Sequence, residues 1–586
     1  MPRLIEALPP AFGQRSDGAD GVFGVSWWTT DDDIAPGFFA SGPDFAVLGQ
    51  CGRGLLSAAR LGRLLQEWTA HGHSAFNSLS FDFSLAIFDR ARRELTLCLA
   101  PLSSLGLAYR HHQGRLHFST LASSLATGSG VNLRWLARQR GPEAHFGADE
   151  TAFDGVYLVE PGTIVQFRAG EAAGVRRFWS ARRGPGGSDA EVADALRSAL
   201  DAAVEDVTSD ISHPIAAHLS AGRDSGVVAA TAARALSVRG KSLIAFTAIP
   251  SPSIIDRLVP GAYEGPGAVA VASMHRGMQH QLVSVAGCDL GALLDRQNAH
   301  LDGPYGTPAN LPWWNRILEL ASEKGARLLL TGATGNLTVS AGGPWALGDL
   351  LGSGQFVAWA RTMRQSRRAR GASLTNLLAT SFGPLVPEAL YRRLLQLTRR
   401  RPHPFGATFL RGDLQQLTLA QQDVDTRPTR DWVGLLHHAL ETSANAGLNS
   451  EILYGVTLRD PTADRRVVEA SLRLSLRQLA SPYDQRPIFE RAFADRLPPV
   501  TLRPAYRGVQ GSDWFHSIDP VALTRNLRRY GESASVREYI DVDAMLVLIE
   551  NWPSDGRLSP ASANLFGVQL LPTVSLASFL HCHWPG

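Results

Sequence analysis

A short loop of small residues carries the strongest chemical signal in the sequence. Residues 220–225 read Ser-Ala-Gly-Arg-Asp-Ser and follow the apolar segment 214–219. Small residues in a tight turn between a strand and a helix leave backbone N–H groups facing outward, and the following helix adds its positive end. Such a turn binds an anion such as a phosphate. The alternative is an ordinary helix N-cap formed by Asp224 or Ser225.

The loop differs from the P-loop of nucleoside triphosphatases. The pattern GxxxxGK[ST] does not occur in the chain, and lysine is found only at Lys241 and Lys324. Arginine must therefore supply nearly all of the positive charge. A phosphate site here requires a different type of loop.

Alternating strands and helices must position this loop. Apolar periodicity predicts strands over 214–219, 242–247, 281–285 and 327–331, and helices over 191–207, 225–236, 267–274 and 313–322. Such alternation predicts a parallel sheet with right-handed crossovers. Ligands of these sheets gather at the carboxyl ends of the strands, where the loop lies. Beyond about residue 350 we expect helices.

The first 180 or so residues follow another pattern. Short β-rich runs at 83–88, 94–99, 115–118 and 162–167 predict a sheet-based domain. A segment rich in Gly, Pro and Arg then leads to a helix N-cap at Ser188 or Asp189. We therefore expect one domain over residues 1–182 and a second over residues 190–586.

Composition is typical of a globular protein. The 586 residues are 44% hydrophobic and 19% charged, and the net charge of +3 is too small to predict nucleic-acid binding. The four cysteines lie far apart and lack the spacing of a zinc site or a disulfide framework. The N-terminus lacks a signal-peptide pattern, and no apolar run approaches the ~18 residues of a membrane span. We expect a cytoplasmic protein without membrane contact.

The loop and several later segments resemble the asparagine synthetase and β-lactam synthetase family of ATP pyrophosphatases. Residues 220–225 resemble its SGGxDS pyrophosphate loop, with Ala221 in place of the first glycine. Further segments follow in the order that the family has: Phe246-Thr247, Glu264 to His280, Asp302-Gly303-Pro304-Tyr305-Gly306, 330–336, 455–464 and 486–499.

This resemblance implies a site for ATP and Mg²⁺. The residues that it implies in ATP binding are His218, Leu219, Ser220, Ala221, Gly222, Arg223, Asp224, Ser225, Phe246, Thr247, Thr331 and Gly332. It implies Asp224 as a catalytic residue and a magnesium ligand. The second acidic ligand of the family falls on Asn336, which is neutral. Either the triphosphate then supplies more of the magnesium ligands, or another acid such as Asp302 binds the ion as well.

The first domain is similar to the class II glutamine amidotransferase domain that precedes these synthetases. The similarity lies in segments 81–89, 101–118 and 156–179, and it implies an Ntn-type αββα sandwich. An active domain of this type needs cysteine as its processed first residue, whereas this chain has Pro2 and its first cysteine is Cys51. We therefore expect no glutaminase activity, and a nucleophile other than ammonia from glutamine.

Finer motifs resemble lasso peptide cyclases. β-Lactam synthetases have a tyrosine where this chain has Ala333 and a lysine near the C-terminus, whereas no lysine follows Lys324. Segments 335–338 and 507–514 look like those of lasso cyclases, and Arg507 is the candidate catalytic cation for the ATP phosphates or the acyl-adenylate. The candidate substrate contacts are Ala333, Asn336 and Asp302.

The resemblance implies an AMP-forming ligase that adenylates an Asp or Glu side chain of a precursor peptide. The N-terminal amine of the peptide then displaces AMP, and a macrolactam forms. Both reactants belong to one molecule, where effective molarities reach roughly 10⁵ M or more. A leader-peptide protease and a leader-recognition protein are the expected partners. The alternatives are another amide-forming synthetase, of the β-lactam synthetase or glutamine-independent asparagine synthetase type, and a non-catalytic scaffold that binds a nucleotide or peptide.

Overall fold

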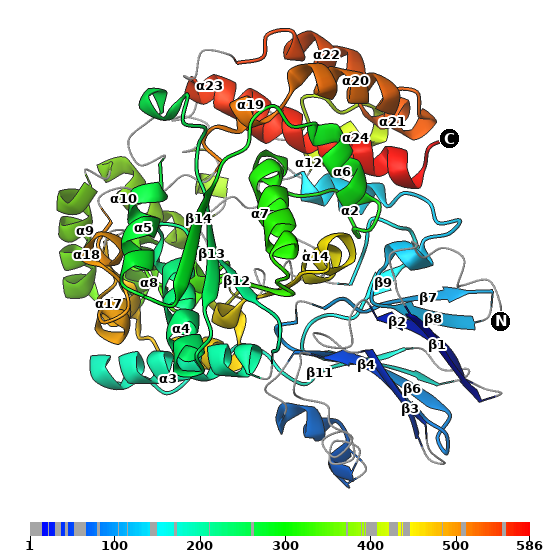
Figure 1. The fold of residues 1–586 in the computed structure, drawn as a ribbon, viewed down its shortest axis with the longest axis horizontal. Coiled ribbons are helices and arrows are strands. Elements are labelled where there is room, and N and C mark those ends of the chain that lie inside the picture. The colour runs from blue at the N-terminus through cyan, green and yellow to red at the C-terminus, as the bar shows by residue number, and fades with distance from the viewer. Residues whose placement is uncertain are drawn as a thin grey trace.

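A computed structural model gives the fold of the chain (Figure 1). The structure describes residues 14–20, 23–29, 37–41, 45–51, 66–68, 70–78, 82–103, 105–113, 115–140, 149–168, 173–209, 211–258, 263–370, 373–387, 389–391, 393, 407–420, 432–434, 436, 446–482, 485–504, 511–553 and 558–586.

A parallel sheet lies at the centre of the second half of the chain. Its strands, as described, are β12 (Ile215–His218), β13 (Leu243–Ala248), β14 (Met278–Val283), β15 (Leu328–Leu330) and β16 (Thr457–Arg459). The first four confirm the strands predicted from periodicity. In contrast, β16 lies where only helices were expected. The spatial order is β14-β13-β12-β15-β16, so the carboxyl ends of β12 and β15 form the topological switch point.

Helices cover both faces of this sheet. They include α3 (Asp189–Thr208), α4 (Arg223–Val238), α5 (Gly265–Ser273), α6 (Leu290–Asn298) and α7 (Leu311–Glu323). Ile215 and Ala217 of β12 pack into the core with α3 and α4, whereas Ala216 packs with α7 on the other face. This alternation is the period of two that a strand requires.

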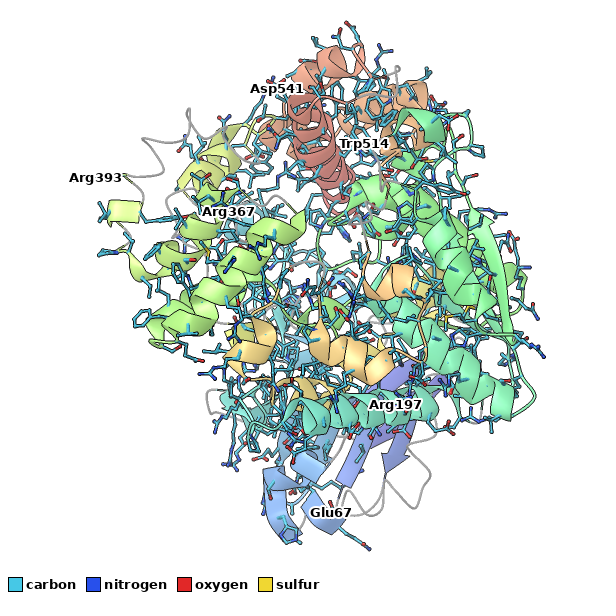
Figure 2. The ribbon with its side chains drawn as sticks, turned by 90° about the vertical axis from the view of Figure 1, so that its left-hand side faces the viewer. Glu67, Arg197, Arg367, Arg393, Trp514 and Asp541 are labelled. Carbon is cyan, nitrogen blue, oxygen red and sulfur yellow. The ribbon has the colours of Figure 1, made fainter. Side chains whose placement is uncertain are left out.

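The start of α3 agrees with the sequence prediction. Ser188 is its N-cap, and a capping box with Glu191 satisfies the first turn. Arg197, labelled in Figure 2, anchors the same helix to the C-terminal half of the chain. Its guanidinium donates to the Ala492 carbonyl and to Asp495, each at 2.6 Å.

Beyond β15 the described chain is mainly helical. Its α-helices are α8 (Leu347–Gly352), α9 (Phe356–Arg370), α10 (Leu374–Phe382), α12 (Gly412–Ala420), α14 (Ala446–Tyr454), α15 (Arg465–Ser471), α16 (Leu476–Leu479), α17 (Pro487–Phe493), α18 (Pro499–Leu502), α19 (Trp514–Ser517), α20 (Pro520–Tyr530), α21 (Ala534–Tyr539), α22 (Val542–Ile549), α23 (Pro560–Ser562) and α24 (Leu571–His583).

The N-terminal region is built from antiparallel sheets. The largest has the order β11-β10-β6-β5-β4-β3, another has the order β8-β7-β9, and β1 pairs with β2. Their bounds are β1 (Gln14–Asp20), β2 (Phe23–Thr29), β3 (Gly37–Ser41), β4 (Phe45–Cys51), β5 (Phe83–Asp89), β6 (Glu94–Leu99), β7 (Ala108–His112), β8 (Arg115–Ser119), β9 (Tyr157–Leu158), β10 (Thr163–Arg168) and β11 (Gly174–Arg177).

Strand β5 is buried on both faces because its alternate residues enter two cores. Leu85 and Ile87 pack with Phe76 of the 3₁₀ helix η1 (Gly72–Ser78), whereas Ala86 and Phe88 pack beneath the sheet that contains β7. The helix α2 (Leu133–Gln139) packs with Ala108 of β7, on the far side of that second sheet. The region is thus layered as helix, sheet, sheet and helix.

The two halves of the chain share a hydrophobic core. Phe153 of the N-terminal region packs against Phe579 of α24, with ring centroids 5.8 Å apart, and both rings contact Trp584. Strand β11 ends at Arg177 and α3 begins at Asp189, so the expected boundary falls between these elements. The division into domains 1–182 and 190–586 stays a prediction.

One helical segment corrects an expectation about apolar runs. Ala563–His583 has 21 residues, and its most apolar 18-residue window has a mean hydropathy of 1.5, enough by length and composition to cross a membrane. Sequence inspection missed it because Asn564, Gln569 and several serines interrupt the run. However, 67% of its most apolar window is buried within the protein. It therefore packs here as a core helix.

Candidate functional site

The loop between β12 and α4 leaves the helix N-terminus open. Gly222 is the N-cap and no side chain caps the helix, so the alternative of a cap by Asp224 or Ser225 is wrong. Instead, the Ser225 hydroxyl accepts a bond from the Ser220 N–H at 3.0 Å and lies 2.7 Å from the Ser220 hydroxyl. The Gly222 N–H donates to that Ser220 hydroxyl at 3.0 Å. The side chains fold the turn and leave the positive end of α4 available to an anion.

A second loop, after β15, lies directly against the first turn of α4. A Cβ added to Gly332 would lie 2.7 Å from the Asp224 carbonyl carbon, and one added to Gly335 would lie 2.6 Å from Asp224 Oδ1. The backbone N–H of Thr331 donates to the Arg459 carbonyl at 2.9 Å, which extends the pairing of β15 with β16. The structure therefore brings together the predicted residues of both loops. Only glycine permits this closeness.

Asp224 lies between the two loops and is buried. Its Oδ1 atom has no hydrogen-bond partner among the residues that the structure describes. Burial raises the pKa of Asp224 to about 6, and the nearby Asp460 acts in the same direction. The Ser340 hydroxyl and the guanidinium groups of Arg223 and Arg486 lower it. A buried carboxylate that keeps one oxygen without a partner among the described residues is a candidate ligand site.

Several residues that act on Asp224 were missed in the sequence. Asp460 holds the second loop, because its Oδ2 accepts from the Thr334 N–H at 2.7 Å and its Oδ1 from the Thr462 N–H at 2.9 Å. Arg486 donates from Nε to the Ser340 carbonyl at 2.9 Å. Asp460 and Arg486 occur in segments that resemble family motifs, which is the signal that could have found them.

Phe246 and Thr247, two of the predicted ATP-binding residues, both contact the strand that leads into the phosphate loop. Phe246 is fully buried in the core beside α7, and its carbonyl accepts from the Leu219 N–H at 2.8 Å. The Thr247 hydroxyl donates to the Leu219 carbonyl at 2.5 Å and lies 2.8 Å from His280 Nε2. These residues fix the start of the phosphate loop in place, and a role in nucleotide binding stays a prediction.

His218 ends β12 inside an aromatic cluster. Its ring stacks on Trp313 with centroids 5.4 Å apart and meets Trp314 edge-on at 5.8 Å. Burial lowers the pKa of His218 to about 4, so the ring is neutral at pH 7. Ala221, two residues into the loop, contacts Gly267 of α5, where an added Cβ would lie 2.6 Å from that of Ala221.

The other predicted residues lie apart from this cluster or outside the described residues. Arg507 lies outside the described residues. Ala333 and Asn336 are exposed in the second loop, on either side of the buried Gly335. Asp302 is buried elsewhere: its Oδ1 accepts from the Ala122 N–H at 2.8 Å and the Ser123 N–H at 3.2 Å. It is not among the charges that act on Asp224.

Among the described residues of the site, one carboxylate, that of Asp224, is suited to bind Mg²⁺. The Oδ1 atom of Asp224, which has no partner among the described residues, is a hard oxygen donor next to the open helix end, which suits a cation held jointly with phosphate oxygens. Asn336, exposed in the second loop, offers a neutral amide oxygen. No cluster of three His, Cys, Asp or Glu side chains that could hold a metal occurs among the described residues. Such an ion would depend mainly on the triphosphate.

Comparison with known proteins identifies the family. A family model described as asparagine synthase matches residues 195–571, which is more than half of the 586 residues. The chain belongs to the asparagine synthase family. Members of this family are ATP-dependent amide-forming ligases. The match covers both loops, Asp224 and the whole parallel sheet.

Solved structures give only remote similarities. A glutamine phosphoribosylpyrophosphate amidotransferase from B. subtilis, complexed with ADP and GMP, is 11% identical with a TM-score of 0.18, and the match covers 45% of this chain and 68% of that chain. The structure of an allosteric regulatory enzyme of purine biosynthesis is 10% identical with a TM-score of 0.18, covering 43% and 64%. No curated protein matches this asparagine synthase family member.

Proposed function

We propose that the protein is an ATP-dependent macrolactam-forming ligase of the lasso peptide cyclase type. A side-chain carboxylate of a precursor peptide attacks the α-phosphorus of ATP, and an acyl-adenylate and pyrophosphate form. The N-terminal amine of the same peptide then displaces AMP. The observation that carries this proposal is the open N-terminus of α4 beside Asp224 Oδ1, a buried oxygen without a partner among the described residues.

This chain contributes binding and orientation to the first step. The N–H groups at the start of α4 would bind polyphosphate oxygens, and Asp224 would hold Mg²⁺, with Asn336 as a further candidate ligand. The magnesium ion would withdraw charge from the phosphates. Asp460 and Arg486 keep the second loop and Asp224 in position. Arg507 stays the candidate cation for the phosphates or the acyl-adenylate, and Ala333 stays a candidate substrate contact.

We further propose that residues 1–182 form an Ntn-type domain without glutaminase activity. The packing of η1, the two sheets and α2 in successive layers supports the Ntn-type assignment. With no glutamine-derived ammonia, the nucleophile is the amine of the peptide itself. A leader-peptide protease and a leader-recognition protein would then prepare the substrate in the cytoplasm.

The test uses synthetic peptides that have a free N-terminal amine and a single Asp or Glu at varied spacing. The protein is incubated with each peptide, ATP and Mg²⁺, and mass spectrometry follows the loss of one water while a coupled assay measures AMP. The proposal expects both signals to rise together. ADP production, or no nucleotide consumption with any peptide, contradicts it and favours the scaffold. Product from two separate molecules favours another synthetase of the family.

A further inference from the structure

Helices α9 and α10 pack together through their inner faces. Trp359 of α9 and Leu377 of α10 pack with the fully buried Leu347 of α8. The Trp359 Nε1 atom donates to the Ser381 hydroxyl at 3.0 Å, and the Trp359 ring meets the Phe382 ring edge-on with centroids 6.1 Å apart. The two helices therefore form one packed unit, and their outer faces adjoin.

The outer face of α9 is cationic. Four exposed arginines, spaced so that they lie on one side of the helix, are Arg361, Arg364, Arg367 and Arg368. Arg367 is labelled on this helix in Figure 2. The chain has no acidic residue between Asp349 and Glu388, so neither α9 nor α10 supplies a counter-charge.

These four arginines differ from exposed arginines elsewhere in the chain. Arg503 and Arg525 are exposed, yet they pair with Glu490 and Asp289, each at 2.8 Å. In contrast, no ion pair reaches the four arginines of α9 from the residues that the structure describes. Like charges on one helix face repel one another, and the carboxylates of an acidic partner would relieve this repulsion.

A strip of apolar side chains runs along the outer face of α10. Leu374, Leu378 and Phe382 follow one another four residues apart and are 44%, 37% and 44% exposed. The strip is about 12 Å long, because each helical residue rises about 1.5 Å. Phe356 and Val357, at the start of α9, are also exposed, and the contact of Phe382 with α9 brings the strip to the same end of that helix. Exposed apolar surface bordered by charge is typical of an interaction site.

Symmetry and depth exclude two kinds of occupant. A two-fold dimer through this surface would place arginines against arginines, which disfavours a second copy of the chain. More than half of each side chain in the strip is covered by the protein, so the strip lies level with the surface. It does not project into the acyl region of a bilayer as an interfacial helix does.

The spacing and the charge select a helix as the occupant. Apolar side chains four residues apart complement a helix that presents apolar residues at the same spacing. The arginines of α9 lie beside the strip and require acidic residues on the flank of that helix.

We propose that the outer faces of α9 and α10 dock an acidic amphipathic helix of a partner protein. Its apolar residues cover Leu374, Leu378 and Phe382, and its carboxylates pair with the arginines of α9. The inference does not rest on the proposed function. Because α8 follows the second loop through the 3₁₀ helix η6 (Pro344–Ala346), the docked partner sits on the segment that continues that loop.

The first experiment uses two synthetic peptides that are stapled as helices and labelled with fluorescein. Both carry the same glutamates, but one has leucines four residues apart and the other has serines in their place. Fluorescence anisotropy measures binding to the whole protein. We expect saturable binding of the leucine peptide and binding weaker by about tenfold or more for the serine peptide. No saturable binding of the leucine peptide, or equal binding of both, overturns the docking surface.

Charge reversal tests the arginines. Arg364→Glu with Arg368→Glu should weaken binding of the leucine peptide by about tenfold or more, because carboxylates then face carboxylates. Arg176→Glu with Arg528→Glu is the matched control, since both residues are exposed on other elements and the net charge changes equally. This control should bind as the wild type does, and circular dichroism verifies the fold of both. Equal binding by the two double variants, whether weakened or not, overturns the proposal.

A single substitution tests the apolar strip. Leu378→Ser should weaken binding of the leucine peptide by about fivefold, because it removes apolar contact area and leaves the charge unchanged. Val547→Ser, at an exposed position of α22, is the control and should bind as the wild type does. Unchanged binding in Leu378→Ser contradicts a role for the strip.

Cosedimentation with vesicles of phosphatidylcholine and phosphatidylglycerol tests a lipid surface as the occupant. At physiological ionic strength we expect the protein to stay in the supernatant. Binding to the vesicles that is lost in Arg364→Glu with Arg368→Glu would assign the surface to a membrane and overturn the proposal.

Discussion

Two buried glutamates show how the halves of this molecule differ. Glu94, in the antiparallel region, is 4% exposed and accepts bonds from Gln166 Nε2 and Arg168 Nε, each at 2.6 Å. Glu264, at the edge of the parallel sheet, is similarly buried but has no partner within the described chain. The first carboxylate is used to hold strands β6 and β10 together. The second holds no other element of the described chain in place.

The same contrast holds for two aspartates. Asp302 joins the halves by accepting two backbone N–H groups, whereas Asp224 keeps one buried oxygen without a partner among the described residues. Folding free energy favours satisfied groups, so an unsatisfied carboxylate oxygen at the switch point of the sheet indicates a site retained for function. The comparison predicts that mutations at the two kinds of acid change stability in opposite directions.

Asp224→Asn should have the largest effect. Unfolded, this carboxyl ionises near its ordinary pKa of 3.8, whereas in the folded protein it keeps its proton to about pH 6. Its contribution to the free energy of unfolding therefore falls as pH rises through this window, and the loss persists at pH 7. Without Mg²⁺, the amide should raise the unfolding free energy at pH 7 by about 1–3 kcal/mol and lower AMP formation by about 100-fold or more. Urea unfolding at pH 3.5 and 7, with the AMP assay, measures both.

Glu94→Gln is the matched control for this prediction. It removes a charge from two hydrogen bonds in a buried setting, but Arg168 is half exposed, so a loss of only about 1 kcal/mol is expected. AMP formation by the folded protein should not change. A stabilising Glu94→Gln, or a destabilising Asp224→Asn, would remove the distinction between the two regions.

Gly335→Ala should have the next largest effect. The new Cβ would lie 2.4 Å from that of Asp224, so the second loop must move away from α4. We expect the unfolding free energy to fall by about 1–3 kcal/mol and AMP formation to fall by about tenfold. Gly306→Ala is the control, because no atom lies within 4 Å of its added Cβ. Equal effects of the two substitutions would show that the close approach does not matter.

Local patterns predicted the sheet well but not its last strand. The strands β12 to β15 follow apolar runs between helices of regular spacing, and each was found within a few residues. Strand β16 is only three residues long, and its first residue, Thr457, pairs with Leu328, which lies 129 positions earlier in the chain. This pairing depends on tertiary structure alone. Short strands that depend on a distant partner leave little signal in a local window.

The site was predictable to the extent that it is continuous in sequence. Residues 220–225 show their chemistry in their own composition, whereas the approach of Gly335 to Asp224 joins segments more than a hundred residues apart. Asp302 shows the opposite case, in which a local motif suggested a role that the tertiary contacts of the residue do not support. Its motif suggested the substrate site, but its carboxylate is directed to the backbone of Ala122 and Ser123, contacts that no pattern within 302–306 contains.

Asp302→Ala tests that structural assignment and should have a smaller, purely structural effect. Two N–H groups near the start of the 3₁₀ helix η2 (Ser123–Leu125) lose their acceptor, which costs about 1–2 kcal/mol of unfolding free energy. Asp302→Asn retains an acceptor oxygen and should recover at least half of that loss. AMP formation by the folded fraction should match the wild type in both variants. A selective loss of AMP formation would return Asp302 to the substrate site.

The substitutions Ala221→Gly and Gly267→Ala should have the smallest effect on stability. The informative quantity is the coupling free energy between them. The family loop has glycine where this chain has Ala221, and the helix opposite has Gly267 where a Cβ would lie 2.6 Å from that of Ala221. Gly267→Ala gains helix propensity of about 1 kcal/mol but creates this overlap, so alone it should be near neutral in stability. Combined with Ala221→Gly, the overlap disappears and a coupling of about 1 kcal/mol should emerge in a double-mutant cycle. Zero coupling would mean that the loop and α5 move independently, so that the close approach of Gly267 to Ala221 does not fix the loop.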